Sequence, residues 1–143
     1  MTIATAQRCP CCSHAKLSAS CRPGRVLRYR NTVLALPADL RLPRCKCCRY
    51  EDLSLAALPE GMAEALYRSG LRERAVSAIG ALRLYRPLRK IELLLNLSQG
   101  YLSRLGSGDA VPGAALVSLL ALLAAQPELI DRLDGYWTLP LQG

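Results

Sequence analysis

Two short segments, each with three cysteines in four positions, constrain the fold of this 143-residue chain most strongly. They read RCPCC at residues 8–12 and RCKCC at residues 44–48. In each segment the first and last cysteines have the C-x-x-C spacing, which lets a tight turn bring two sulfur atoms to one metal ion. The doubled spacing predicts one structural Zn²⁺ per chain, held by Cys9, Cys12, Cys45 and Cys48.

The other cysteines and the single histidine are predicted to lie outside this site. Cys11 and Cys47 directly precede a predicted ligand, and adjacent residues cannot easily both point at one metal ion. We interpret Cys21 as a small apolar filler and His14 as a polar surface residue. The alternative is a set of buried or redox-active thiols without a metal. A closed four-cysteine site has no open coordination position, so we expect it to be structural.

The cellular location is also an expectation from sequence. The first residues show no basic segment followed by an apolar one, as a secretory signal would. The longest apolar run, residues 114–125, is too short to span a bilayer. We therefore expect a cytoplasmic protein without a membrane partner, in a compartment where paired cysteines are more often metal ligands than disulfides.

The residue pattern predicts an α+β chain with a small β-rich zinc ribbon followed by an all-α domain of five helices. We expect the ribbon at 1–56, a linker helix and hinge at 57–70, and a helix-turn-helix domain at 71–138. Between the cysteine pairs, short apolar stretches bounded by Pro, Gly and Asn favour a hairpin or a three-stranded ribbon. That segment has too few apolar residues for a core of its own, so it needs a metal.

Apolar residues recur at helical spacing from residue 58 onward. The predicted helices are 58–70, 71–85, 87–96, 97–105, 112–125 and 127–133, with a hinge at Ser69–Gly70 and Ser98 as an N-cap. Leu71, Ala75, Ile79 and Leu82 share one helix face. The helix at 112–125 is apolar nearly all round, which predicts burial against the core on one face and against a second copy on another.

Charge is distributed in alternating blocks. Residues 1–50 hold ten basic residues and one acid, and residues 68–104 hold eight basic residues and two acids. Residues 51–67 and 105–143 are net acidic. One basic block alone is equally consistent with a solvated surface. Two such blocks in a small chain favour a nucleic acid or an acidic protein as a partner.

The segment at 96–112 resembles the second half of a Cro-repressor-like (Xre) helix-turn-helix. Leu97 and Leu102 can anchor a recognition helix, whose N-terminus favours phosphate. Gln and Arg side chains suit contacts with base edges. The predicted DNA-binding residues are Ser98, Gln99, Tyr101, Ser103 and Arg104 for the bases, with Arg86, Arg89 and Lys90 for the phosphates. The alternative is an ordinary helical bundle with a solvated basic face.

The order of ribbon, linker helix and Xre-type domain resembles the MqsA (YgiT-type zinc-finger) antitoxin family. The resemblance is best over residues 101–133, at Ser103–Arg104, Gly108–Ala110, Pro112, Leu119–Leu120 and Pro127–Leu129. It implies a structural zinc, a dimer, a palindromic double-stranded operator and, in the best-known members, a toxin held by the ribbon or its flank. It also implies a base contact by Arg104.

The chain departs from the family pattern at four positions. Gly100 stands where the family has a base-contacting Asn, and Pro87 where it has a capping Thr. Leu88 replaces a polar residue that touches phosphate, and Gly106 replaces an acidic residue. These departures predict a different and weaker DNA site.

We therefore expect a zinc-containing, DNA-binding regulator of antitoxin type that represses its own operon and neutralises a toxin. The chain has one histidine, no paired carboxylates and no phosphate-binding glycine loop, so we expect no enzymatic activity. The alternative function is a protein-interaction adaptor whose helices only dimerise or bind a partner. A weaker hypothesis is a redox sensor that uses Cys11 and Cys47.

Overall fold

The computed structural model describes residues 7–137, which form a mixed α+β fold of two compact units. The boundary between the N-terminal and C-terminal units lies between Tyr67 and Arg68. Residues 1–6 of the predicted ribbon and Thr138 at the end of the predicted helical domain lie outside the described residues.

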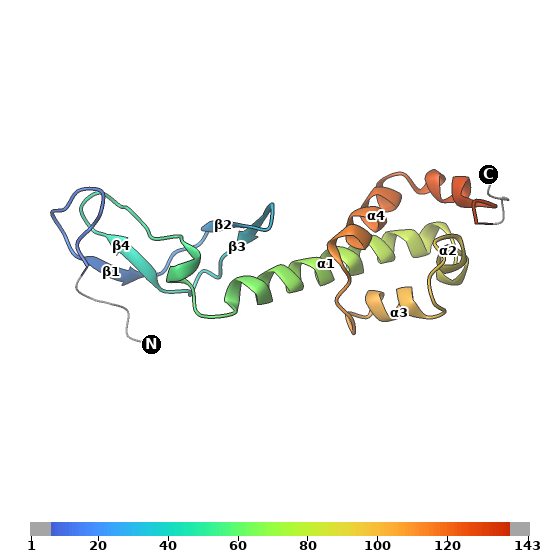
Figure 1. Ribbon diagram of the computed structural model, residues 1–143, viewed down its shortest axis with the longest axis horizontal. Helices are drawn as coiled ribbons and strands as arrows, with labels where there is room; N and C mark the ends of the chain where they lie inside the picture. Colours follow the sequence, from blue (N-terminus) through green and yellow to red (C-terminus); the bar gives the residue numbers. More distant parts are fainter. Residues whose placement is uncertain (1–6, 138–143) are drawn as a thin grey trace, which may run out of the picture. The chain divides into compact units, whose positions relative to one another are not determined.

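The N-terminal unit contains two small antiparallel sheets (Figure 1). Strand β1 (Leu17–Ser20) pairs with β4 (Leu42–Cys45), and β2 (Val26–Tyr29) pairs with β3 (Thr32–Ala35). Arg30 and Asn31 join β2 to β3 with positive φ angles of 47° and 58°. This conformation matches the twist of a two-residue hairpin. The predicted hairpin is confirmed, as one of two separate sheets.

A small apolar core and one buried arginine hold the loops of this unit together. Leu36, Leu42 and Leu58 are buried, and Leu58 directly follows the 3₁₀ helix η1 (Leu55–Ala57). Arg25 is only 2% exposed. Its guanidinium donates hydrogen bonds to the carbonyls of Ser20 (3.3 Å), Pro37 (3.1 Å) and Leu40. A buried cation thus ties the end of β1 to two loop carbonyls, since the apolar core is too small to fix them alone.

Helix α1 (Met62–Tyr85) differs from the sequence prediction, because it continues through Gly70. A helix and a hinge were predicted to meet there, with a second helix from Leu71. A glycine ends a helix when it takes the left-handed conformation. Gly70 is not among the residues with positive φ, so the backbone stays helical. The two predicted helices are therefore one.

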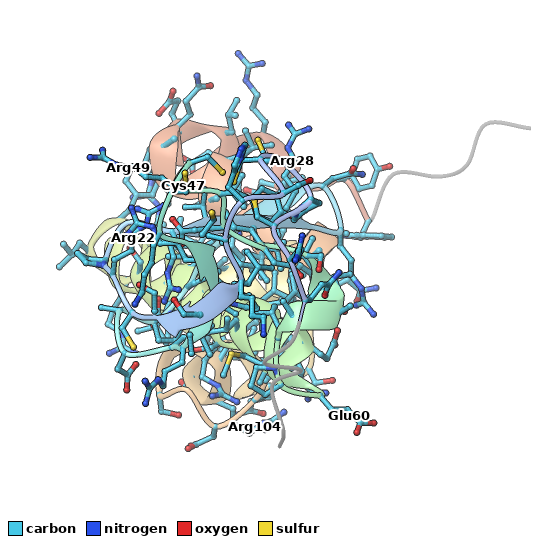
Figure 2. All side chains as sticks on the ribbon, turned by 90° about the vertical axis from the view of Figure 1, so that its left-hand side faces the viewer. Arg22, Arg28, Cys47, Arg49, Glu60 and Arg104 are labelled. Atoms are coloured by element: carbon cyan, nitrogen blue, oxygen red, sulfur yellow. The ribbon has the colours of Figure 1, made fainter. Side chains whose placement is uncertain are left out.

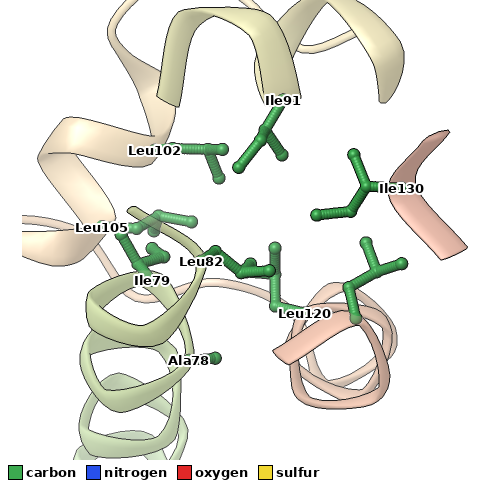
Figure 3. Packing of buried hydrophobic residues seen from close by; sticks show 9 residues of the cluster. Ala78, Ile79, Leu82, Ile91, Leu102, Leu105, Leu120 and Ile130 are labelled. Carbon is green, nitrogen blue, oxygen red and sulfur yellow. The ribbon is translucent and has the colours of Figure 1, made fainter. Parts of the chain in front are cut away.

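The C-terminal unit packs the end of α1 against four short helices. They are α2 (Leu88–Leu94), α3 (Tyr101–Gly106), α4 (Ala114–Ala125) and the 3₁₀ helix η2 (Pro127–Leu133). The predicted face of Leu71, Ala75, Ile79 and Leu82 is buried, as expected. Figure 3 shows the core, which contains Ala78, Ile79, Leu82, Ile91, Leu102, Leu105, Leu120, Leu123 and Ile130.

Helix α3 begins later than predicted. We expected a helix from Leu97 with Ser98 as its cap, but the helix begins at Tyr101 with Gly100 at the N-cap position. The carbonyl of Ser98 accepts the Tyr101 N–H at 3.1 Å, so Ser98 belongs to the turn between α2 and α3.

Within residues 7–137, no single helix is both long and apolar enough to cross a bilayer. Helices α4 and η2 reach the required length and hydropathy only when taken together, and a bend of 112° separates them.

Candidate metal centre and nucleic-acid surface

The sulfur atoms of Cys9, Cys12, Cys45 and Cys48 all lie within 4.8 Å of one another. Cys9 Sγ is 3.5 Å from Cys48 Sγ, and Cys12 Sγ is 3.6 Å from Cys45 Sγ. These separations are far longer than the ~2.05 Å bond of a disulfide. They are close to the ~3.8 Å edge of a tetrahedron whose corners lie about 2.3 Å from a central ion. The four predicted cysteines are therefore brought together and can hold a metal ion.

The two turns that carry these cysteines have the same hydrogen-bond pattern. Cys9 and Cys45 are each 1% exposed, and each sulfur accepts the backbone N–H of the residue two positions later at 3.4 Å. Each carbonyl accepts the N–H of the residue four positions later, Ser13 or Arg49, at 3.1 Å. Both of these residues have positive φ angles, 57° and 65°. The repeated motif therefore folds twice into one local structure.

Strand pairing brings the two turns together. The β1–β4 register places Leu17 opposite Cys45. Isolated bridges join Arg8 to Lys16 and Arg44 to Glu51 at the bases of the two turns. The short sheet thus fixes the distance between turns that are separated by 32 residues from Cys12 to Cys45.

The thiols of the cluster differ in acidity. A backbone hydrogen bond from His14 lowers the pKa of Cys12 to about 6, and its contacts with the other three sulfurs act in the same direction. The pKa of Cys48 is raised to about 12. A backbone hydrogen bond from Tyr50 lowers it, but desolvation and the neighbouring thiols outweigh that bond. Cys12 therefore offers an incoming cation a ready thiolate, whereas Cys48 must release its proton when a metal binds.

The remaining cysteines lie outside the cluster. Cys11 and Cys47 are exposed and do not belong to the group of four sulfurs, as predicted (Figure 2 labels Cys47). The negative charge of the Cys12 thiolate raises the pKa of Cys47. Less of the Cys47 thiol is then in the reactive thiolate form, which weakens the redox-sensor hypothesis. Cys21 is exposed and directs its sulfur to the Asp39 carbonyl at 3.3 Å, so its prediction as a buried filler was wrong. His14 is exposed.

On α3 and the preceding turn, the predicted base-contacting residues mostly face outward. Ser98, Gln99, Ser103 and Arg104 are exposed, and Tyr101 is half-buried. Figure 2 labels Arg104 at the surface. The Arg104 guanidinium lies 5.9 Å from the centroid of the Tyr101 ring. Leu102 is fully buried and Leu97 packs against the core, so both fit the predicted role of anchor.

The three predicted phosphate-binding residues are not equally free. Arg86 lies 3.1 Å from Asp131 and stacks on the Tyr85 ring at 4.3 Å. Arg89 Nη1 is 3.7 Å from Glu92 Oε1. Lys90 is exposed, and within residues 7–137 it forms no ion pair. Lys90 is therefore the cation of the three that a phosphate could engage without displacing an acidic partner.

Sequence reasoning missed Glu92. This carboxylate is 2% exposed, and it accepts the backbone N–H of Gly100 at 3.1 Å and that of Leu102 at 2.9 Å. One signal was available in the sequence. Glu92 is an acid within the apolar run IELLL, and it lies eight residues before Gly100, the N-cap of α3, which has no side chain.

No family model and no curated protein matches the chain. The resemblance to the antitoxin family therefore remains a prediction. Two features of this chain bear on its function: a four-sulfur cluster that can hold a metal, and a turn and helix with exposed Gln99 and Arg104 side chains in a basic segment.

Proposed function

We propose that this protein is a zinc-stapled, DNA-binding transcriptional regulator of antitoxin type. The observation that carries the proposal is the α2–turn–α3 unit. Its inner residues Leu102 and Leu105 are fully buried, while Gln99, Ser103 and Arg104 remain exposed. In this reading α2 and α3 form the helix-turn-helix, and α3 enters the major groove. The excess of basic residues at 68–104 supports a polyanionic partner.

Zinc is the ion proposed for the cysteine cluster. Four thiolates in a tetrahedral arrangement suit Zn²⁺, and a closed set of four leaves no position for a substrate. The role is therefore structural. Free thiols suit a reducing cytoplasm, which is the location that we propose.

A second copy of the chain is proposed as a further partner. On α4, Leu122 is 64% exposed and Leu119 is 39% exposed. A recess of about 400 Å³ between α1 and α4 is lined largely by alanines, including Ala81, Ala121 and Ala124. A two-fold dimer formed there would match a palindromic operator. A toxin as a third partner rests on the family resemblance alone.

Selection of bound duplexes from a random pool tests the DNA-binding proposal. The selected sequence should bind in a salt-dependent manner. Arg104→Ala should then weaken the selected duplex by about 1–3 kcal/mol and relax the preference at one base pair per half-site. Lys90→Ala, at the exposed cation without an acidic partner, should weaken selected and scrambled duplexes alike and reduce the salt slope by roughly one. Arg132→Ala, an exposed arginine on η2, is the matched control and should change neither.

An adaptor protein is the alternative, and the exposed apolar side chains favour it. Leu84 is 90% exposed, in addition to Leu122. A chain that sediments as a dimer but shifts no duplex at low salt would support the adaptor and contradict the DNA-binding proposal. If Arg104→Ala loses the same factor of affinity for the selected and the scrambled duplex, Arg104 contacts a phosphate. The base contacts would then be assigned to Gln99 or Ser103.

A further inference from the structure

The backbone amides of Gly100, Tyr101 and Leu102, at the start of α3, are occupied within the protein. The amides of a first helical turn have no partner inside the helix, and a capping side chain or a bound anion usually accepts them. Gly100 at the N-cap has no side chain. Instead, the Gly100 and Leu102 N–H groups donate to Glu92, and the Tyr101 N–H donates to the Ser98 carbonyl at 3.1 Å. These amides are therefore not available to a DNA phosphate, contrary to the expectation from sequence.

Glu92 joins α2 to the start of α3 in two ways. Its carboxylate accepts the two amides of α3, and its backbone carbonyl accepts the Leu97 N–H at 2.8 Å within the turn. A hydrogen bond to an ionised acceptor is roughly twice as strong as a neutral one. Burial keeps water from competing, since only 2% of the residue is exposed. Arg89 Nη1 at 3.7 Å is the cation nearest to this charge.

We propose that Glu92 is the positioning residue of the reading helix. Resting on the proposed function, its carboxylate replaces the missing cap of Gly100 and fixes the angle at which α3 presents Arg104, and the turn before it presents Gln99, to base edges. Glu92 does not touch DNA. It acts through the backbone of Gly100 and Leu102, so its loss should affect sequence reading more than general attraction to the duplex.

Glu92→Gln is the main test, because it keeps the volume of the side chain and removes the charge. The amide group retains one oxygen acceptor and turns an N–H₂ group toward a second N–H donor, so one α3 amide loses its partner. At a temperature where the variant is fully folded, affinity for the duplex selected by the wild-type chain should fall about tenfold. Affinity for a scrambled duplex should not fall, since no phosphate-binding cation is removed and loss of the Glu92 charge only frees Arg89.

Amide hydrogen exchange of the full chain provides a readout that needs no DNA. In the wild type, the Gly100 and Leu102 amides should be protected. Glu92→Gln should increase the exchange of at least one of these two amides by tenfold or more relative to core amides such as that of Leu105, which lies further along the same helix. Glu128→Gln, the same change at an exposed glutamate on η2, should alter neither exchange nor binding.

Each outcome decides a separate claim. Equal weakening of both duplexes would overturn the positioning role in DNA reading, and unchanged exchange at Gly100 and Leu102 would overturn the cap itself. If the wild-type chain binds no duplex, the proposed function fails and base reading fails with it, while the exchange result still decides whether Glu92 positions α3. Should Glu92→Gln not fold, Glu92→Asp keeps the charge but shortens the reach, and it should show the same exchange pattern to a smaller degree.

Discussion

Gly100 links the backbone at the start of α3 to the chemistry of its surface. Its φ angle is +81°, in the left-handed region that glycine adopts readily and Asn adopts better than other side chains. A Cβ atom there would lie 3.6 Å from Arg104 Nη1, which is an ordinary contact. The Asn that the family resemblance implies at this position would therefore suit the same backbone. The departure concerns side-chain chemistry and leaves the fold unchanged.

Gly100→Ala should destabilise the protein by about 1 kcal/mol, because Ala is strained in the left-handed region. Gly100→Asn should cost less. Urea unfolding monitored by circular dichroism measures both changes. Gly80→Ala is the matched control: Gly80 lies within α1 with open space around it, so the free energy of unfolding should rise slightly. A Gly100→Ala protein as stable as the wild type would contradict the conformation described for this turn.

The cysteines give a second prediction at the scale of single residues. Serine substitution at Cys9, Cys12, Cys45 or Cys48 should abolish binding of the proposed zinc, because each sulfur lies within 4.8 Å of the other three. Cys11→Ser and Cys47→Ser are the matched controls, since both thiols are exposed and neighbour a ligand. These two variants should keep one zinc per chain by elemental analysis. Loss of zinc from either control as complete as that from Cys9→Ser would make the assignment of ligands wrong.

At the scale of elements, features that follow from a repeating apolar pattern could be predicted from the sequence. Features that depend on a single distant contact could not. The helix face of Leu71, Ile79 and Leu82 was predictable because the core selects apolar residues at helical spacing. The start of α3 was not predictable from such spacing. It depends on the left-handed Gly100 and on the bonds from Glu92, and no local pattern specifies either.

The two candidate sites differ in the same way. The metal ligands could be predicted because C-x-x-C spacing is a local property of each turn, and the pattern occurs twice. The free or paired state of the surface cations could not be predicted. Arg86 is paired with Asp131, which lies 45 residues further along the chain, and only the packing of η2 brings them together. A local pattern that predicts the helices therefore does not show which surface cations are free of acidic partners.

Helix α4 allows a prediction that separates its two faces. Leu120 is fully buried in the core, whereas Leu122 is largely exposed. Leu120→Ala should lower the free energy of unfolding by about 2–5 kcal/mol, as expected for a cavity in a packed core. Leu122→Ala should change it by less than about 0.5 kcal/mol in a monomer, but it should weaken the proposed dimer.

Urea unfolding at low protein concentration and sedimentation at several concentrations distinguish these effects. The dimer proposal would be contradicted if the wild type sediments as a monomer at micromolar concentration. It would also be contradicted for this face of α4 if Leu122→Ala dimerises as tightly as the wild type.

At the scale of the whole molecule, residues 7–137 contain two separate apolar cores. The core of the N-terminal unit contains Leu36, Leu42 and Leu58, and the core of the C-terminal unit contains the residues of Figure 3. Helix α1 contributes to both, through Leu66 in the first and Leu82 in the second. Only the N-terminal unit also contains the cysteine cluster. The two units should therefore respond differently to loss of a metal.

Removal of zinc with a strong chelator should unfold the N-terminal unit and leave the C-terminal unit folded. Zinc binding by four thiolates supplies about 10–16 kcal/mol of folding free energy in small metal-stapled modules, and the three buried leucines of the core of this unit cannot replace that amount. Amide exchange should show loss of protection in β1 and β4, with protection retained in α2, α3 and α4.

Affinity for the selected duplex should remain within about twofold, because the proposed DNA contacts all lie beyond residue 85. Cys45→Ser should reproduce the chelated state. If instead the helical unit loses protection at the same chelator concentration, the two cores depend on each other for stability and the division into independent units is wrong.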